Sequence, residues 1–172
     1  MAALDALFLK FATNKLGQLS ARIVDCLGRL ADDQIWSRDG QNQNAVGNLV
    51  LHLCGNVRQW ILSGVGGAVD ARDRDAEFAA RGELSGPELA ARLEATVARA
   101  LEIVRNTTAE RLTQTVRIQG YEVSVLEAIG HVTEHFAQHT GQIIYATKLL
   151  TGADLGYYRH LSKVRSHSEQ TP

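Results

Sequence analysis

Apolar residues recur every three or four positions in four long stretches of this 172-residue chain, and this spacing restricts the fold more than any other feature. The stretches cover residues 3–30, 45–62, 85–104 and 125–151. Such spacing places the apolar side chains on one face of an α-helix, whereas a half-buried strand would alternate at every second position. The sequence therefore predicts an all-α fold in which four amphipathic helices form a bundle.

Local signals mark where the last two helices begin and end. Ser85 and Ser124 are each followed three residues later by a glutamate, Glu88 and Glu127. A serine and a glutamate at this spacing form a capping box, which satisfies free backbone amides at a helix N-terminus. Gly152 follows the last apolar position and is typical of a helix C-terminus.

The connections differ in character. Residues 36–44 have the glycine, asparagine and aspartate content of a loop, and residues 112–123 alternate apolar and polar side chains around Gln119-Gly120. The second pattern predicts a small β-hairpin before the last helix. Residues 69–83 carry many charges of both signs, which predicts a short solvated helix with surface ion pairs, attached to the bundle by Phe78.

Composition favours a single domain over residues 1–172 and excludes several classes of partner. Eighteen basic and nineteen acidic residues give a net charge of −1, so no basic surface for nucleic acid is expected. The two cysteines are too few for a disulfide-stapled domain, and no stretch approaches the roughly 20 apolar residues of a membrane span. We expect a soluble cytoplasmic protein whose last ~10 residues are disordered.

Histidines on two of the predicted helices suggest a metal site. His131, His135 and His139 are four residues apart and share one face of the last helix, while His52 lies in the middle of the second. Two imidazoles at positions i and i+4 can bind one ion, and a third from a neighbouring helix completes a set with open positions. His52, His135 and His139 are therefore the candidate ligands, with room for water or substrate.

Polar side chains accompany these candidate ligands. Asn56 and Gln59 lie within about 40° of His52 around the helix axis, and Gln138 and Gln142 follow the other two ligands. They are candidates to orient the imidazoles or to contact a bound substrate. The alternative is a wet seam of the bundle, in which these polar groups bond to one another without an ion.

Two protease motifs do not explain the histidines. The HEXXH motif requires a glutamate after its first histidine, and here Phe136 follows His135. Residues 131–135 match the inverted HXXEH pattern. That class also needs a glutamate ligand far downstream in a much larger fold, and only Glu169 follows Glu134. We interpret this match as accidental.

The combination of motifs resembles a known superfamily. His52 in LHLCGN, and HFAQHTGQI with His135, His139, Gly141 and Gln142 in the pattern HXXXHXGQ, are similar to the DinB-like superfamily of damage-inducible four-helix proteins, in particular an uncharacterised branch. The resemblance covers nearly the whole chain. It implies that His52, His135 and His139 hold zinc, nickel or another divalent ion, and that the protein forms a homodimer.

The resemblance also implies an activity. Several members of the superfamily are S-transferases that use bacillithiol, mycothiol or glutathione, and some related proteins isomerise maleylpyruvate with mycothiol. A metal- and thiol-dependent S-transferase acting on a small molecule is therefore expected. His131 lies outside the triad pattern, and its role is open: an orienting partner, an occasional fourth ligand or a general base. A non-catalytic metal-binding or sensing bundle and a metal-assisted hydrolase are the alternatives.

Overall fold

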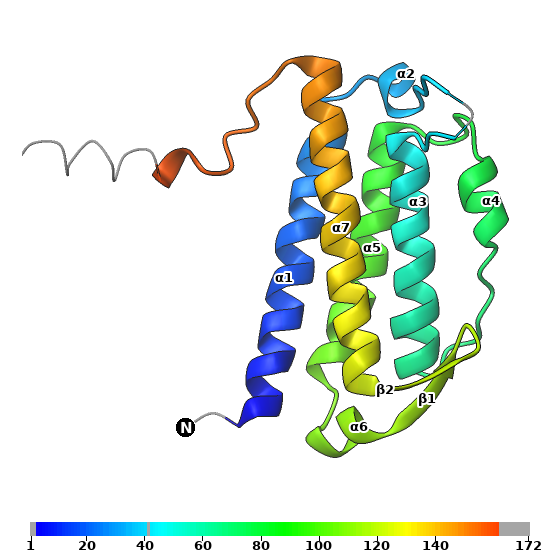
Figure 1. Cartoon of the computed structure of the whole chain (residues 1–172), viewed down its shortest axis with the longest axis vertical. Helices are drawn as coiled ribbons and strands as arrows, with labels where there is room; N and C mark the ends of the chain where they lie inside the picture. The colour runs from blue at the N-terminus through cyan, green and yellow to red at the C-terminus, as the bar shows by residue number, and fades with distance from the viewer. Residues whose placement is uncertain (1–2, 41, 162–172) are drawn as a thin grey trace, which may run out of the picture.

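Four long helices form the body of the protein, as predicted. The computed structural model describes residues 3–40 and 42–161, and the long helices are α1 (Leu4–Leu27), α3 (Val46–Val57), α5 (Gly86–Arg105) and α7 (Val125–Thr151). Helices α1 and α7 run in one direction, and α3 and α5 run in the other (Figure 1). Each helix packs against two neighbours, in the circular order α1, α5, α3, α7.

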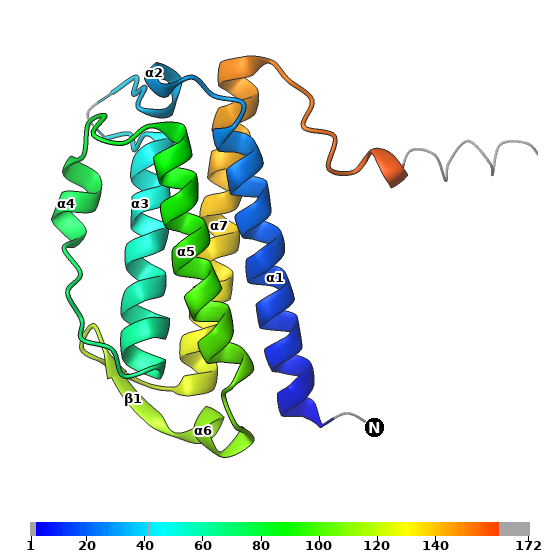
Figure 2. The ribbon, with the colours of Figure 1, turned by 180° about the vertical axis from the view of Figure 1, so that it is seen from behind.

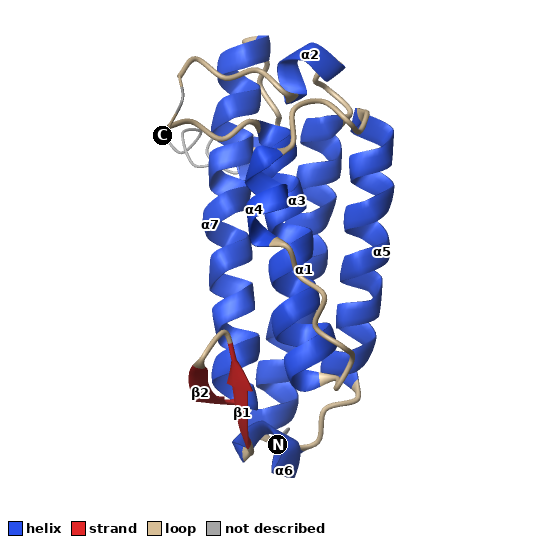
Figure 3. Ribbon diagram, turned by 90° about the vertical axis from the view of Figure 1, so that its right-hand side faces the viewer, coloured by secondary structure: helices blue, strands red, loops and turns tan. Residues whose placement is uncertain are grey.

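A long crossover follows from this topology. Because α3 and α5 are neighbours that run in the same direction, the chain between them must return along the whole bundle. It does so outside α3 and carries the short helix α4 (Arg74–Ala79), as Figures 2 and 3 show. We call residues 66–85 the crossover. It packs against α3, so it covers one side of the helix that holds His52.

The helix boundaries differ from the predicted ones in a few places. The first helix ends at Leu27 rather than at residue 30, because Gly28 begins a turn. The second continues beyond residue 62 as the π-helix η1 (Arg58–Val65). Two single-turn helices, α2 (Asp32–Ile35) and α6 (Ala109–Thr113), were not predicted.

The predicted hairpin and the start of the last helix are confirmed. Strands β1 (Thr115–Ile118) and β2 (Tyr121–Ser124) pair antiparallel, with the turn at Gln119-Gly120 in left-handed backbone conformation. Ser124 then begins α7, where its hydroxyl accepts from the Glu127 amide at 3.2 Å and its own amide donates to the Glu127 carboxylate at 2.7 Å. Gly152, at φ 66°, ends the helix in the left-handed conformation.

The core lies between the four helices, and the histidines lie at its edge between α3 and α7. Its largest fully buried side chains are Leu16, Ile23, Ile35, Leu53, Ile61, Leu89, Leu93, Ile129, Phe136 and Ile143. The two cysteines are buried and free, as expected of core residues. Within residues 3–40 and 42–161, no helix combines the length and apolar character needed to cross a bilayer. His167 and the tail expected to be disordered lie outside the described residues.

Candidate metal centre

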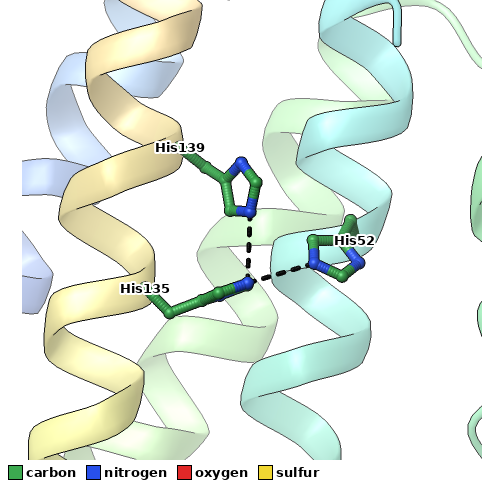
Figure 4. A group of neighbouring side chains, drawn as sticks. All are labelled: His52, His135 and His139. Carbon is green, nitrogen blue, oxygen red and sulfur yellow. Dashed lines mark hydrogen bonds between the residues drawn. The ribbon is translucent and has the colours of Figure 1, made fainter. Parts of the chain in front are cut away.

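Three imidazoles converge between α3 and α7. The Nε2 atom of His135 lies 3.1 Å from Nε2 of His52 and 3.1 Å from Nε2 of His139 (Figure 4). One possible donor atom from each of the three residues lies within 4.8 Å of the others. The antiparallel packing of α3 on α7 therefore brings the three candidate ligands together. His52 is buried and the other two are half-buried, so the group lies near the surface.

The other ring nitrogen of His52 bonds to a carboxylate. Its Nδ1 lies 3.0 Å from Oε2 of Glu77 on α4. Burial by itself raises the pKa of Glu77, but hydrogen bonds from Arg72 and His52 outweigh burial and lower that pKa. Glu77 is thus ionised and only accepts hydrogen bonds. A His52 ring that donates to this carboxylate carries a proton on Nδ1, and in the neutral ring Nε2 then presents a lone pair to His135.

Arg72 contacts the same nitrogen but lies closer to the carboxylate. Its Nη2 is 3.1 Å from Nδ1 of His52 but 2.8 Å from Oε2 of Glu77, and its Nε donates to Oε1 of Glu77 at 2.8 Å. Two parallel N–H···O bonds between a guanidinium and a carboxylate form the strong bidentate pair. Arg72 therefore holds the carboxylate in the orientation that accepts from His52.

His139 has its own partner one helical turn away. Its Nδ1 lies 2.6 Å from Oε1 of Gln142, an amide oxygen that can only accept. Burial lowers the pKa of His139, so the ring is neutral at pH 7. With its proton on Nδ1, Nε2 of His139 is a second lone pair directed at His135.

His135 cannot satisfy both lone pairs with a proton. Burial, followed by the charges of His139 and His52, lowers the pKa of His135 to about 3, so the ring carries one proton at pH 7. A proton on Nε2 reaches only one of the two neighbours, and a proton on Nδ1 leaves three lone pairs facing one another. Nδ1 is buried and has no hydrogen-bond partner within the described residues.

A divalent ion resolves this arrangement. Imidazoles bind zinc at about 2.0–2.1 Å, and tetrahedral geometry then separates the ligand atoms by about 3.3 Å. Two of the nitrogen–nitrogen separations, at 3.1 Å, are close to that value, and the donor atoms of all three residues lie within 4.8 Å of one another. Three neutral nitrogen donors suit zinc, nickel and similar ions. The residues present therefore fit a metal with three protein ligands and at least one open position.

The remaining predicted residues lie around the triad in different settings. The His131 ring centroid lies 4.1 Å from that of Trp60, with the two planes tilted by 37°, and 5.6 Å from that of the stacked His135 ring. Burial lowers the pKa of His131. Asn56 is buried, and its Oδ1 has no hydrogen-bond partner within the described residues. Gln138 is exposed.

Gln59 contacts the crossover. It accepts from Nη1 of Arg72 at 3.0 Å and donates to Asp70 at 2.8 Å. Of the two predicted neighbours of His52, Asn56 is thus a buried amide, and Gln59 holds the crossover through hydrogen bonds. Contact of either residue with a substrate stays a prediction.

The expectation that the charged run is solvated is wrong for its central residues. The side chains of Arg72 and Glu77 are 4% and 9% exposed, because the crossover lies against α3. The expected role of Phe78 is supported, since its ring lies 4.8 Å from the ring of His52. Neither Glu77 nor Arg72 was predicted from the sequence as part of the site. The available signal was Gly55, three residues after His52, which leaves space for a side chain from another segment.

Comparisons with known proteins agree with this architecture. The family model described as "Protein of unknown function (DUF1572)" matches residues 4–166. A conserved protein from Enterococcus faecalis aligns at TM-score 0.68 and 14% identity, over 84% of this chain and 97% of that one. A DinB-like protein from Bacillus cereus ATCC 10987 aligns at TM-score 0.62 and 16% identity, over 77% and 85%. No curated protein matches the sequence.

Proposed function

The chain belongs to the DUF1572 family and has a DinB-like fold, and we propose that it binds one divalent ion, zinc or nickel, through His52, His135 and His139. The observation that carries the proposal is the convergence of three Nε2 atoms, two of which belong to rings whose Nδ1 atoms face hydrogen-bond acceptors. Glu77 and Gln142 fix the protons of the two outer rings on Nδ1. A polar seam without an ion would instead need donors facing acceptors.

We further propose that the site acts on a small molecule, most concretely as a thiol-dependent S-transferase. A bound divalent ion would supply a Lewis acid that lowers the pKa of a coordinated low-molecular-weight thiol. The three histidines leave a coordination position for such a thiol, and the half-buried setting of His135 and His139 gives access to it. Superfamily resemblance supports the choice of reaction.

His131 is the proposed proton acceptor of this reaction. Its ring is half-buried next to His135, and burial lowers its pKa, so it is neutral and able to accept a proton at pH 7. The nearby carboxylates are less suitable, since Glu77 already accepts from Arg72 and His52 and Glu134 is exposed. Asn56 and Gln138 are proposed substrate contacts.

One observation favours a non-catalytic alternative. His131 is the most suitable base candidate beside the triad, and the centroid of its ring lies only 4.1 Å from that of Trp60. If that contact keeps a substrate away from His131, the ion holds α3 and α7 together without chemistry. In that case, removing the metal lowers the melting temperature, and replacing His131 by alanine changes no activity.

The test of the metal site is elemental analysis of untagged protein. We expect about one divalent ion per chain in the wild type, its loss in His52→Ala and in His135→Ala, and its retention in His160→Ala. His160 is an exposed histidine outside the triad and serves as the matched control. A wild type without metal, even after reconstitution with zinc and nickel, would refute the proposal.

The test of the chemistry follows with loaded protein. A screen of several thiols against several electrophiles is expected to show turnover that requires the metal and decreases in His131→Ala. If no pair gives metal-dependent turnover, the transferase proposal fails. Homodimer formation remains part of the proposal. It is measured by light scattering, and the exposed Leu4, Leu7 and Phe11 of α1 are available for it.

A further inference from the structure

We propose that Glu77 is a positioning residue of the metal centre, which sets the affinity for the ion by holding the Nδ1 proton of His52. The inference rests on the proposed metal binding and concerns the same site. It assigns a role to the crossover, a segment outside the four bundle helices. The carboxylate is not a metal ligand in this proposal, because its oxygens are already engaged.

Both oxygens of Glu77 have fixed partners. Oε1 accepts from Nε of Arg72 at 2.8 Å, and Oε2 accepts from Nη2 of Arg72 at 2.8 Å and from Nδ1 of His52 at 3.0 Å. Arg72 is itself held from the other side, since its Nη1 donates to Gln59 at 3.0 Å. The carboxylate therefore has one orientation, and that orientation serves His52.

The backbone around Glu77 is also fixed to α3. The amide of Asn48, which is 0% exposed, donates to the carbonyl oxygens of Glu77 at 2.9 Å and Ala80 at 3.1 Å. The Phe78 ring lies against the ring of His52. Asn48 lies one helical turn before His52 on α3, so α4 is positioned relative to the same helix that carries the proposed ligand.

Gly55 provides the space for the carboxylate. A Cβ atom at this position would lie 1.7 Å from Oε1 of Glu77 and 3.0 Å from Nε of Arg72. Any other residue at position 55 would therefore displace the ion pair. A solvated surface ion pair would not require a glycine on the neighbouring helix. The space at Gly55 therefore indicates that the Glu77 carboxylate has a specific binding position beside His52.

The chemical consequence concerns the ligand atom. An imidazole that donates from Nδ1 to a carboxylate is held in the tautomer whose Nε2 binds metal, and its basicity increases. Loss of such a partner typically weakens metal binding 10–100-fold. Glu77 is expected to have an effect of this size, although it contacts no ion.

The test measures zinc affinity at a constant pH by competition with a chromophoric chelator. Glu77→Gln is expected to raise the Kd for zinc about 10-fold or more, whereas Asp75→Asn, an exposed residue of the same helix with the same change of charge, is expected to leave it unchanged. Nitrogen NMR of the metal-free proteins gives a second readout. The wild type is expected to hold the His52 proton on Nδ1, and Glu77→Gln to move part of it to Nε2.

The possible outcomes separate this inference from the proposed function. A wild type that binds no zinc overturns both. Wild-type affinity in Glu77→Gln overturns the positioning role alone and leaves the three-histidine site in place. If Glu77→Gln fails to fold, the double variant Arg72→Met with Glu77→Leu replaces the buried pair with apolar groups, an exchange that proteins often tolerate. The same weakening is expected there, and unchanged affinity in this folded variant would overturn the inference.

Discussion

Replacing Gly55 by alanine is expected to destabilise the metal-free protein, although this change usually stabilises a helix. Gly55 lies inside α3, where alanine is favoured over glycine by about 1 kcal/mol. The new Cβ, however, would lie 1.7 Å from Oε1 and 2.6 Å from Cδ of Glu77. The end of a flexible side chain normally moves aside at little cost, but Arg72 and His52 hold both oxygens of this one.

The magnitude follows from the group that the carboxylate leaves behind. The Arg72 side chain is only 4% exposed, so a displaced Glu77 leaves a buried guanidinium without its bidentate partner. Breaking a buried ion pair costs about 3–5 kcal/mol, and subtracting the helix gain of about 1 kcal/mol leaves a loss of about 2–4 kcal/mol. At about 2–4 °C per kcal/mol for a chain of this size, the melting temperature decreases by roughly 4–16 °C.

The assay is thermal unfolding in the presence of a chelator, followed by circular dichroism. Gly17→Ala in α1 is the matched control, because a Cβ there meets no atom within 4 Å. It is expected to gain up to about 1 kcal/mol. A loss of stability in Gly55→Ala together with a gain in Gly17→Ala would support the position of Glu77 beside Gly55. A Gly55→Ala protein as stable as Gly17→Ala would refute it, since no carboxylate could then occupy the space beside residue 55.

Two further predictions concern acid and the core. Burial and the charges of His139 and His52 lower the pKa of His135 to about 3 in the folded protein. In the unfolded chain the same imidazole binds a proton at about pH 6.5, so acid favours the unfolded state. The metal-free protein should therefore lose stability as the pH falls below about 6.5. Melting temperatures at pH 7.5 and 5.0 measure this, and an equal fall in His135→Gln would contradict it. Phe136→Ala, at 0% exposure, should cost about 3–5 kcal/mol in urea unfolding. Phe11→Ala, at 56% exposure, should cost much less, and equal losses would refute the packing.

The sequence predicted the features that depend on local spacing. The four-residue intervals of His131, His135 and His139 fixed their common face on α7, and the apolar stripes fixed the faces that pack. Because α3 and α7 are neighbours in the bundle, His52 on α3 lies opposite the histidines of α7. The hairpin turn at Gln119-Gly120 and the capping box at Ser124 were equally local, and both were predicted at the correct residues, whereas the first strand begins three residues later than predicted.

The missed features depend on contacts between segments. A glutamate in a charged run has no local pattern that distinguishes a buried partner of histidine from a solvated side chain. Glu77 is 25 residues from His52 in the sequence, and its burial follows from the path of the crossover. The contact between the His131 and Trp60 rings similarly depends on how η1 lies against α7. Neither the burial of Glu77 nor the contact of His131 with Trp60 could be predicted from the periodicity of a single helix.

The distance along the chain between the proposed ligands would affect when an ion could bind. His52 and His135 are 83 positions apart, and α7 follows the other three long helices in the chain. Bringing the two residues together in an unfolded chain costs about 4 kcal/mol of loop-closure entropy, a cost already met in the folded bundle. During synthesis, His52 alone would retain an ion only weakly. Under the proposed function, an ion is therefore expected to bind after α7 has packed on α3, and to stabilise the chains in which α7 is correctly packed.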